Sequence, residues 1–78
     1  MTYKELKFYL IVNLEQENYS FRQRSLNLID RAEDILLSRS SNDITEFAEI
    51  IKEEIQGIEN PEMLHGLRNL TTPFILNA

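Results

Sequence analysis

The amino-acid sequence predicts an all-α fold, a small three- or four-helix bundle built on an antiparallel helical hairpin of residues 20–38 and 43–56. Apolar residues recur at helical spacing in both segments, helix-starting residues precede them, and turn-prone residues separate them. A composition of 42% hydrophobic and 27% charged residues is typical of a globular chain. A chain of 78 residues has room for one domain, which we place at 1–78.

The first segment, residues 2–17, carries conflicting signals. Thr2 and Glu5 have the spacing of a capping box, which starts a helix. The apolar residues alternate with a period of two, which is the pattern of a strand: Leu6, Phe8, Leu10, Val12 and Leu14. We predict a helix that is apolar almost all round, as a central, mostly buried helix is. The alternative is an α+β fold with a strand at about 5–14, for which only residues 73–76 offer a pairing partner.

Residues 20–38 are predicted to form the first helix of the hairpin. Ser20 and Gln23 make a second capping box at its start. An apolar stripe follows at helical spacing: Phe21, Leu28, Ile29, Ala32, Ile35 and Leu36. The sequence Arg-Ser-Ser-Asn at 39–42 is expected to end this helix in a turn, because serine and asparagine side chains compete for backbone hydrogen bonds.

Residues 43–56 are predicted to form the second helix of the hairpin. Asp43 and Glu46 repeat the helix-start signature. The apolar residues of this segment fall within about 100° of one another on the helical wheel: Ile44, Phe47, Ala48, Ile51, Ile55 and Ile58. Gly57 stands where a residue with left-handed backbone commonly ends a helix.

A short last helix is expected after Asn60, an N-cap residue followed by proline at the first helical position. Its apolar residues are Met63, Leu64, Leu67 and Leu70. Gly66 weakens this helix, since glycine is a poor helix former. The Thr-Thr-Pro sequence at 71–73 should end it and leave an apolar tail at 74–76.

Charges at the helix ends predict a register for the hairpin. Arg22 and Arg24 lie near the positive end of their helix, and Glu54 lies near the negative end of the next. Each placement is unfavourable by ~0.3–1 kcal/mol. Folding the hairpin brings these ends side by side, so we expect Glu54 to pair with these arginines, with Arg24 in particular.

Charge also narrows the classes of partner. The net charge is −5, and all of it lies in residues 42–78, because residues 1–41 hold six basic and six acidic side chains. An acidic chain repels the phosphate backbone of nucleic acids, so we expect a protein partner with a basic surface instead. No apolar run is long enough for a membrane span or signal peptide, and there is no cysteine. We therefore expect a cytoplasmic protein.

The sequence offers little for catalysis. Glu62 and His65 have the E-x-x-H spacing of carboxylate-bridged metal sites, but the pair occurs once, and we interpret it as a surface pair. No serine has a recognisable base, and no glycine-rich loop is present to bind phosphate. We predict no catalytic residue, no metal, no cofactor, no small-molecule substrate and no enzymatic activity. A carboxylate and histidine metal-binding protein is the least favoured alternative.

The remaining signal is a surplus of apolar residues outside the main stripes, which is typical of a protein interface. We predict a small interaction module, such as an adaptor, inhibitor, immunity factor or regulator, that acts by docking to a partner protein. The alternative is a structural subunit that is stable as a homodimer or within a larger assembly. The residues predicted to contact the partner are Leu26, Leu37, Glu46, Glu49, Ile50, Glu53, Phe74 and Leu76.

Overall fold

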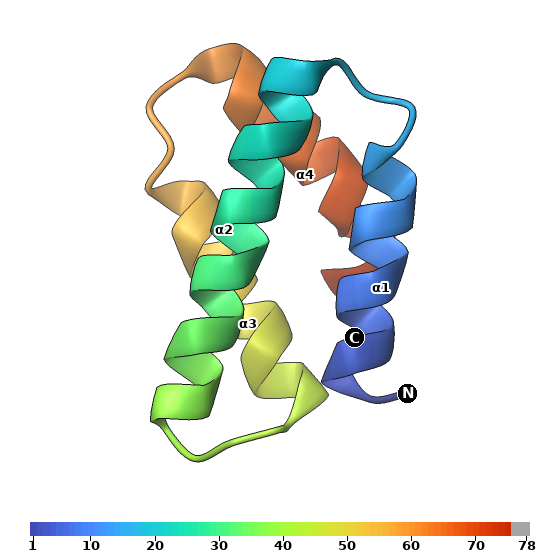
Figure 1. The fold of residues 1–78 in the computed structure, drawn as a ribbon. Helices are drawn as coiled ribbons and strands as arrows, with labels where there is room; N and C mark the ends of the chain where they lie inside the picture. The colour runs from blue at the N-terminus through green and yellow to red at the C-terminus, as the bar shows by residue number, and fades with distance from the viewer. Residues whose placement is uncertain (76–78) are drawn as a thin grey trace.

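The computed structural model describes the backbone of residues 1–75 and the side chains of residues 1–72. Over this range the chain forms four helices and no strand: α1 (Tyr3–Leu14), α2 (Tyr19–Ser38), α3 (Ile44–Gln56) and α4 (Pro61–Ile75). Helices that follow one another in the chain run in opposite directions (Figure 1). The predicted helical bundle is confirmed, and the alternative with a strand at 5–14 is wrong.

Helix α1 begins as predicted but packs differently. The hydroxyl of Thr2 accepts a hydrogen bond of 3.2 Å from the backbone N–H of Glu5, which caps the helix. Only one face of α1 is buried, and its residues are Tyr3, Leu6, Leu10 and Leu14. The expected central, mostly buried helix is therefore wrong. The apolar residues that alternate with a period of two do not all lie on the buried face: Leu6 and Leu10 are buried, whereas Phe8 and Val12 are exposed.

Helix α2 starts earlier than predicted. Asn18, with extended backbone, caps it by accepting a hydrogen bond of 2.9 Å from the N–H of Phe21. The capping box expected at Ser20 and Gln23 is wrong, because Ser20 already lies within the helix. Asparagine is as good an N-cap residue as serine, and at Asn18 it extends the helix toward α1.

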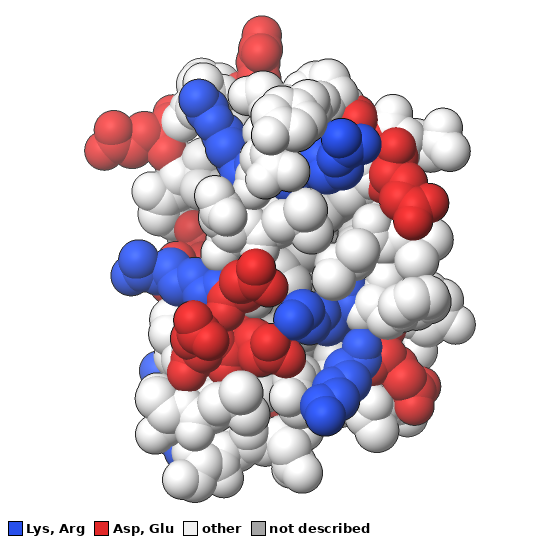
Figure 2. All heavy atoms as spheres, viewed as in Figure 1, with Lys and Arg blue, Asp and Glu red and all other residues white. Residues whose placement is uncertain are grey.

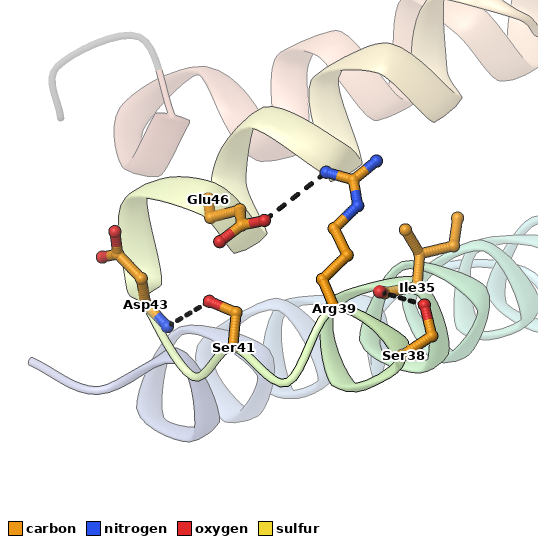
Figure 3. Close-up of polar contacts among 6 residues, drawn as sticks. All are labelled: Ile35, Ser38, Arg39, Ser41, Asp43 and Glu46. Carbon is orange, nitrogen blue, oxygen red and sulfur yellow. Dashed lines mark hydrogen bonds and ion pairs between the residues drawn. The ribbon is translucent and has the colours of Figure 1, made fainter.

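The turn between α2 and α3 lies where the sequence placed it (Figure 3). Ser40 adopts left-handed backbone with φ of 54°, and the N–H of Ser41 donates to the carbonyl of Leu36, which satisfies the end of α2. The Ser41 hydroxyl accepts from the N–H of Asp43 at 3.2 Å. The Asp43 carboxylate then accepts from Thr45 N–H at 3.1 Å, so the predicted cap of α3 is confirmed.

Gly57 does not have the left-handed backbone expected of it. Its φ is −81°, and its N–H donates to the carbonyl of Glu54 at 3.2 Å. The next N–H, of Ile58, donates to Ile55 at 3.1 Å. These bonds span three residues and tighten the last turn of α3, which therefore ends without a left-handed residue.

Two ion pairs set the register of α2 against α3. Arg39 lies 3.5 Å from Glu46, and Arg31 lies 3.2 Å from Glu54. The second pair is eight residues farther from the turn on both helices, or about 12 Å along each axis. The predicted pairing of Glu54 with Arg24 is wrong. Helix α3 has 13 residues against 20 in α2, so its end lies beside the middle of α2.

Helix α3 is the centre of the core. Each of the other three helices has its most extensive contacts with α3. The ring of Phe47 is fully buried and packs edge-on against Tyr3 of α1, with 5.4 Å between ring centroids. The other buried residues of α3 are Ala48, Ile50, Ile51 and Ile55.

Helix α4 begins at the predicted cap and ends later than predicted. The side chain of Asn60 accepts a hydrogen bond of 2.9 Å from Met63 N–H. The helix continues to Ile75, so the expectation that residues 71–73 end it is wrong. The hydroxyls of Thr71 and Thr72 donate to carbonyls four residues earlier, within the helix. They therefore do not draw the backbone into a turn.

Gly66, which looked like a weakness in α4, is a packing site. A Cβ atom built there would lie 2.5 Å from Cε2 and 2.9 Å from Cζ of the Phe21 ring. The missing side chain lets the half-buried ring of α2 lie directly on the backbone of α4. Gly66 thus joins the start of α2 to the middle of α4.

We expect Gly66→Ala to lower the free energy of unfolding by about 1 kcal/mol, because displacement of the Phe21 ring outweighs the helix propensity of alanine. In a Phe21→Ala background the same change should raise it by about 0.5–1 kcal/mol, since only the propensity gain remains. Urea denaturation of the four proteins measures both values. Equal effects of Gly66→Ala in the two backgrounds would show that this contact does not hold α4.

The register of the hairpin is tested by double-mutant cycles. Arg31→Ala with Glu54→Ala should show a coupling energy of about 0.3–1 kcal/mol, as a solvent-exposed ion pair does. Arg24→Ala with Glu54→Ala should show none, because Arg24 lies seven residues from Arg31, nearly two helical turns. A larger coupling for Arg24 than for Arg31 would mean that α3 is shifted along α2.

Candidate partner-binding surface

Exposed apolar side chains are concentrated in the first twelve residues. Among the described residues, six large hydrophobic side chains are exposed: Met1, Phe8, Tyr9, Val12, Tyr19 and Leu37. Four of the six belong to residues 1–12, in or just before α1. A soluble helix ordinarily presents polar residues on its outer face, so this concentration marks α1 and its surroundings as a candidate interface.

The outer side of α1 carries an apolar ridge. Phe8 is 66% exposed and Val12 is 40% exposed. They are one turn apart, with Lys4 one turn before Phe8 and Glu15 nearly one turn after Val12. Glu15 caps α1 with helical backbone, φ −61° and ψ −28°, so it continues the same row. We call Lys4, Phe8, Val12 and Glu15 the α1 ridge.

A second feature is a groove where α1 begins, α2 ends and α3 begins. Its volume is about 570 Å³. Met1 and Leu37 are its exposed large apolar side chains, and Tyr3 and Ile44 also contribute to the lining. Its lining consists of Met1, Thr2, Tyr3, Lys4, Leu37, Asn42, Asp43 and Ile44. We call it the N-terminal groove.

Charged side chains form ion pairs between α1 and α2. Lys7 donates a 2.8 Å hydrogen bond to Glu33 and lies 3.5 Å from Asp30. The bond to Glu33 raises the pKa of Lys7 above its ordinary 10.5, because it outweighs the lowering by partial burial. Acidic and basic side chains lie close together in the middle of the face shown in Figure 2.

The structure separates the apolar residues predicted to bind a partner. Leu37 is 52% exposed and lines the N-terminal groove. Leu26 is half-buried and packs against the core. Ile50 is only 2% exposed, so its assignment to a docking surface is wrong. It lies beside the main stripe of α3, but α3 is enclosed by three helices and buries this residue as well.

The predicted acidic residues lie elsewhere on α3. Glu46 is half-buried and paired with Arg39. Glu49 and Glu53 are exposed, and neither forms an ion pair with another described residue. None of the three lines the N-terminal groove. The side chain of Phe74 and the whole of Leu76 lie outside the described part of the chain.

Phe8 and Val12 were not predicted to be exposed, although the apolar pattern of the sequence contained the signal for their exposure. A helix that is apolar on all sides is either buried all round or exposes apolar surface. The sequence favoured burial, whereas the four-helix arrangement buries only one face of α1. The surplus apolar surface was therefore expected on α2 and the tail, whereas much of it lies on α1.

The predicted surface pair in α4 has no metal-site geometry. His65 is exposed, and its Nε2 lies 3.2 Å from the side-chain nitrogen of Asn69. Among the described residues, no three His, Asp or Glu side chains are grouped so as to hold a metal ion. Nor is any helix in the described range both long and apolar enough to cross a membrane.

Comparisons with protein-family models, curated proteins and solved structures found no match to this chain. We therefore infer function from the surface of the described residues. Its components are the α1 ridge, the N-terminal groove and the charge distribution.

The pH dependence of stability should reveal the Lys7 contact. Because the folded-state pKa of Lys7 is raised, its contribution is complete below the ordinary pKa of 10.5 and is lost as pH rises through the folded value. We expect Lys7→Met to cost about 0.5–1 kcal/mol at neutral pH, and this difference from the unmodified protein to disappear as the pH rises through the folded-state pKa of Lys7.

Urea denaturation of the unmodified protein and the variant at several pH values measures this difference, and the subtraction removes pH effects that are common to both proteins. Lys52→Met on the exposed side of α3 is the control, since Lys52 forms no ion pair with a described residue. A Lys7→Met cost that stays constant while the pH is raised through the titration of Lys7 would show that the ion pairs to Glu33 and Asp30 do not stabilise the fold.

Proposed function

We propose that the protein is a small interaction module that acts by docking to a partner protein through the N-terminal groove. The observation that carries this proposal is the exposure of Leu37, 52%, and of Met1, 67%, on the lining of one groove. Large apolar side chains at a concave surface favour an apolar anchor residue of a protein partner. Lys4 and Asp43 at the same groove offer charged contacts beside this anchor.

The charge of the molecule supports a basic partner. The net charge is −5, and the acidic excess lies in residues 42–78. Glu49 and Glu53 of α3 are exposed and lack ion pairs with described residues, so they remain available to attract positive charge. Such charges raise the rate of encounter and select the partner, while apolar contacts supply much of the affinity.

The use of the other carboxylates supports docking rather than catalysis. Glu33 pairs with Lys7, Glu46 with Arg39 and Glu54 with Arg31. Each of these pairs joins two helices, so these carboxylates contribute to the position of the helices. A carboxylate that holds two helices together has a structural role, so these three residues give no support for catalysis.

The test begins with a photo-crosslinking amino acid at position 37 in cells, which identifies a partner, followed by affinity measurement with both proteins purified. We expect Leu37→Asp to weaken binding by more than tenfold, because a charge in the groove lining disfavours an apolar anchor residue of the partner. Tyr19→Asp is the matched control, because Tyr19, like Leu37, is a large exposed hydrophobic residue of α2 but lies at the opposite end of the helix. Circular dichroism confirms that both variants remain helical.

Two results would contradict the proposal. One is that no protein other than a second copy of this chain is crosslinked at position 37. The other is an identified partner whose affinity falls equally with Leu37→Asp and Tyr19→Asp, because the groove would then have no special part in binding.

A further inference from the structure

We infer that the α1 ridge binds a second copy of this chain, with the two α1 helices antiparallel across a two-fold axis. Lys4, Phe8, Val12 and Glu15 follow one another at spacings of four, four and three residues. These spacings keep them on one side of a helix. The ridge therefore has a positive end, an apolar middle and a negative end. This inference does not depend on the proposed function.

Such a ridge is complementary to itself only when it is reversed. In an antiparallel pair, Phe8 of each chain meets Val12 of the other, and Lys4 meets Glu15. Lys4 and Glu15 are about 16 Å apart along the helix axis, so both ion pairs form at once, one at each end. A parallel pair would instead oppose Lys4 to Lys4 and Glu15 to Glu15.

The side chains of the ridge are available for this contact. Phe8 and Val12 are 66% and 40% exposed. Lys4 and Glu15 are exposed, and neither forms an ion pair with another described residue. Lys7, by contrast, is already engaged with Glu33 on the side of α1 that faces α2.

The distribution of charge over the chain also permits self-association at α1. Residues 1–41 hold six basic and six acidic side chains, so this half carries no net charge. The whole net charge of −5 belongs to residues 42–78, which form α3, α4 and the residues that follow. Two copies that meet through α1 bring together their neutral parts, and a closed two-fold dimer leaves no ridge exposed.

Sedimentation of the purified chain over a wide concentration range tests the pairing. We expect a reversible monomer–dimer equilibrium, and Phe8→Asp should weaken it more than a hundredfold, because it places a charge in the apolar middle. Lys4→Glu and Glu15→Lys should each weaken it about tenfold or more, because each change puts like charges together twice. Lys52→Glu is the control for Lys4→Glu: it makes the same charge change at an exposed position of α3 and should leave dimerisation unchanged.

The decisive measurement is an equal mixture of the Lys4→Glu and Glu15→Lys variants. In an antiparallel heterodimer both ends then hold opposite charges, so we expect dimerisation within about threefold of the unmodified protein. A mixture that stays as weak as the single variants would overturn the antiparallel pairing. A chain that is monomeric at every concentration, or a dimer that survives Phe8→Asp, would overturn the α1 interface. Leu37→Asp should leave the dimer unchanged. The test of the N-terminal groove can therefore fail without affecting the test of the α1 interface.

Discussion

The structure depends on the burial of the apolar stripe of α3 against the three other helices. Phe47 and Ile51 are fully buried, and each neighbouring helix has its most extensive contacts with α3. Burial of one such side chain contributes roughly 1.5–3 kcal/mol, which is large against the marginal stability of a small domain. The chain has no cysteine and hence no disulfide. Packing on α3 is therefore the main source of its stability.

This central position explains why α1 differs from the other helices. Helix α1 packs one face on the core, through Leu6, Leu10 and their neighbours, and is anchored to α2 by Lys7. Its opposite face would be polar in an ordinary outer helix. Instead it carries Phe8 and Val12, which contribute little to the core of a single chain. Apolar residues that the fold leaves exposed suggest a role in binding, and the same argument applies to Leu37 at the N-terminal groove.

The hairpin could be predicted from the sequence because its signals are local. Helical periodicity placed α2 and α3, and Asp43 and Asn60 cap the helices that they were expected to cap. The errors concern non-local choices. Whether α1 is enclosed or peripheral, and whether Ile50 is buried, depends on how many helices surround each element. Neither periodicity nor composition contains that information. The partner of Glu54 depends likewise on the relative lengths of two helices, whose ends are the least certain part of a sequence-based prediction.

Native-state hydrogen exchange at low protein concentration tests the central role of α3 most directly, because it assigns an opening free energy to each amide. If packing on α3 holds the fold together, the amides of residues 47–55 exchange only through global unfolding and show the largest opening free energies in the chain. Those of α1 should open at lower cost, since α1 buries one face and contributes less to the core. Amides of α3 that exchange more readily than those of α1 would contradict this account.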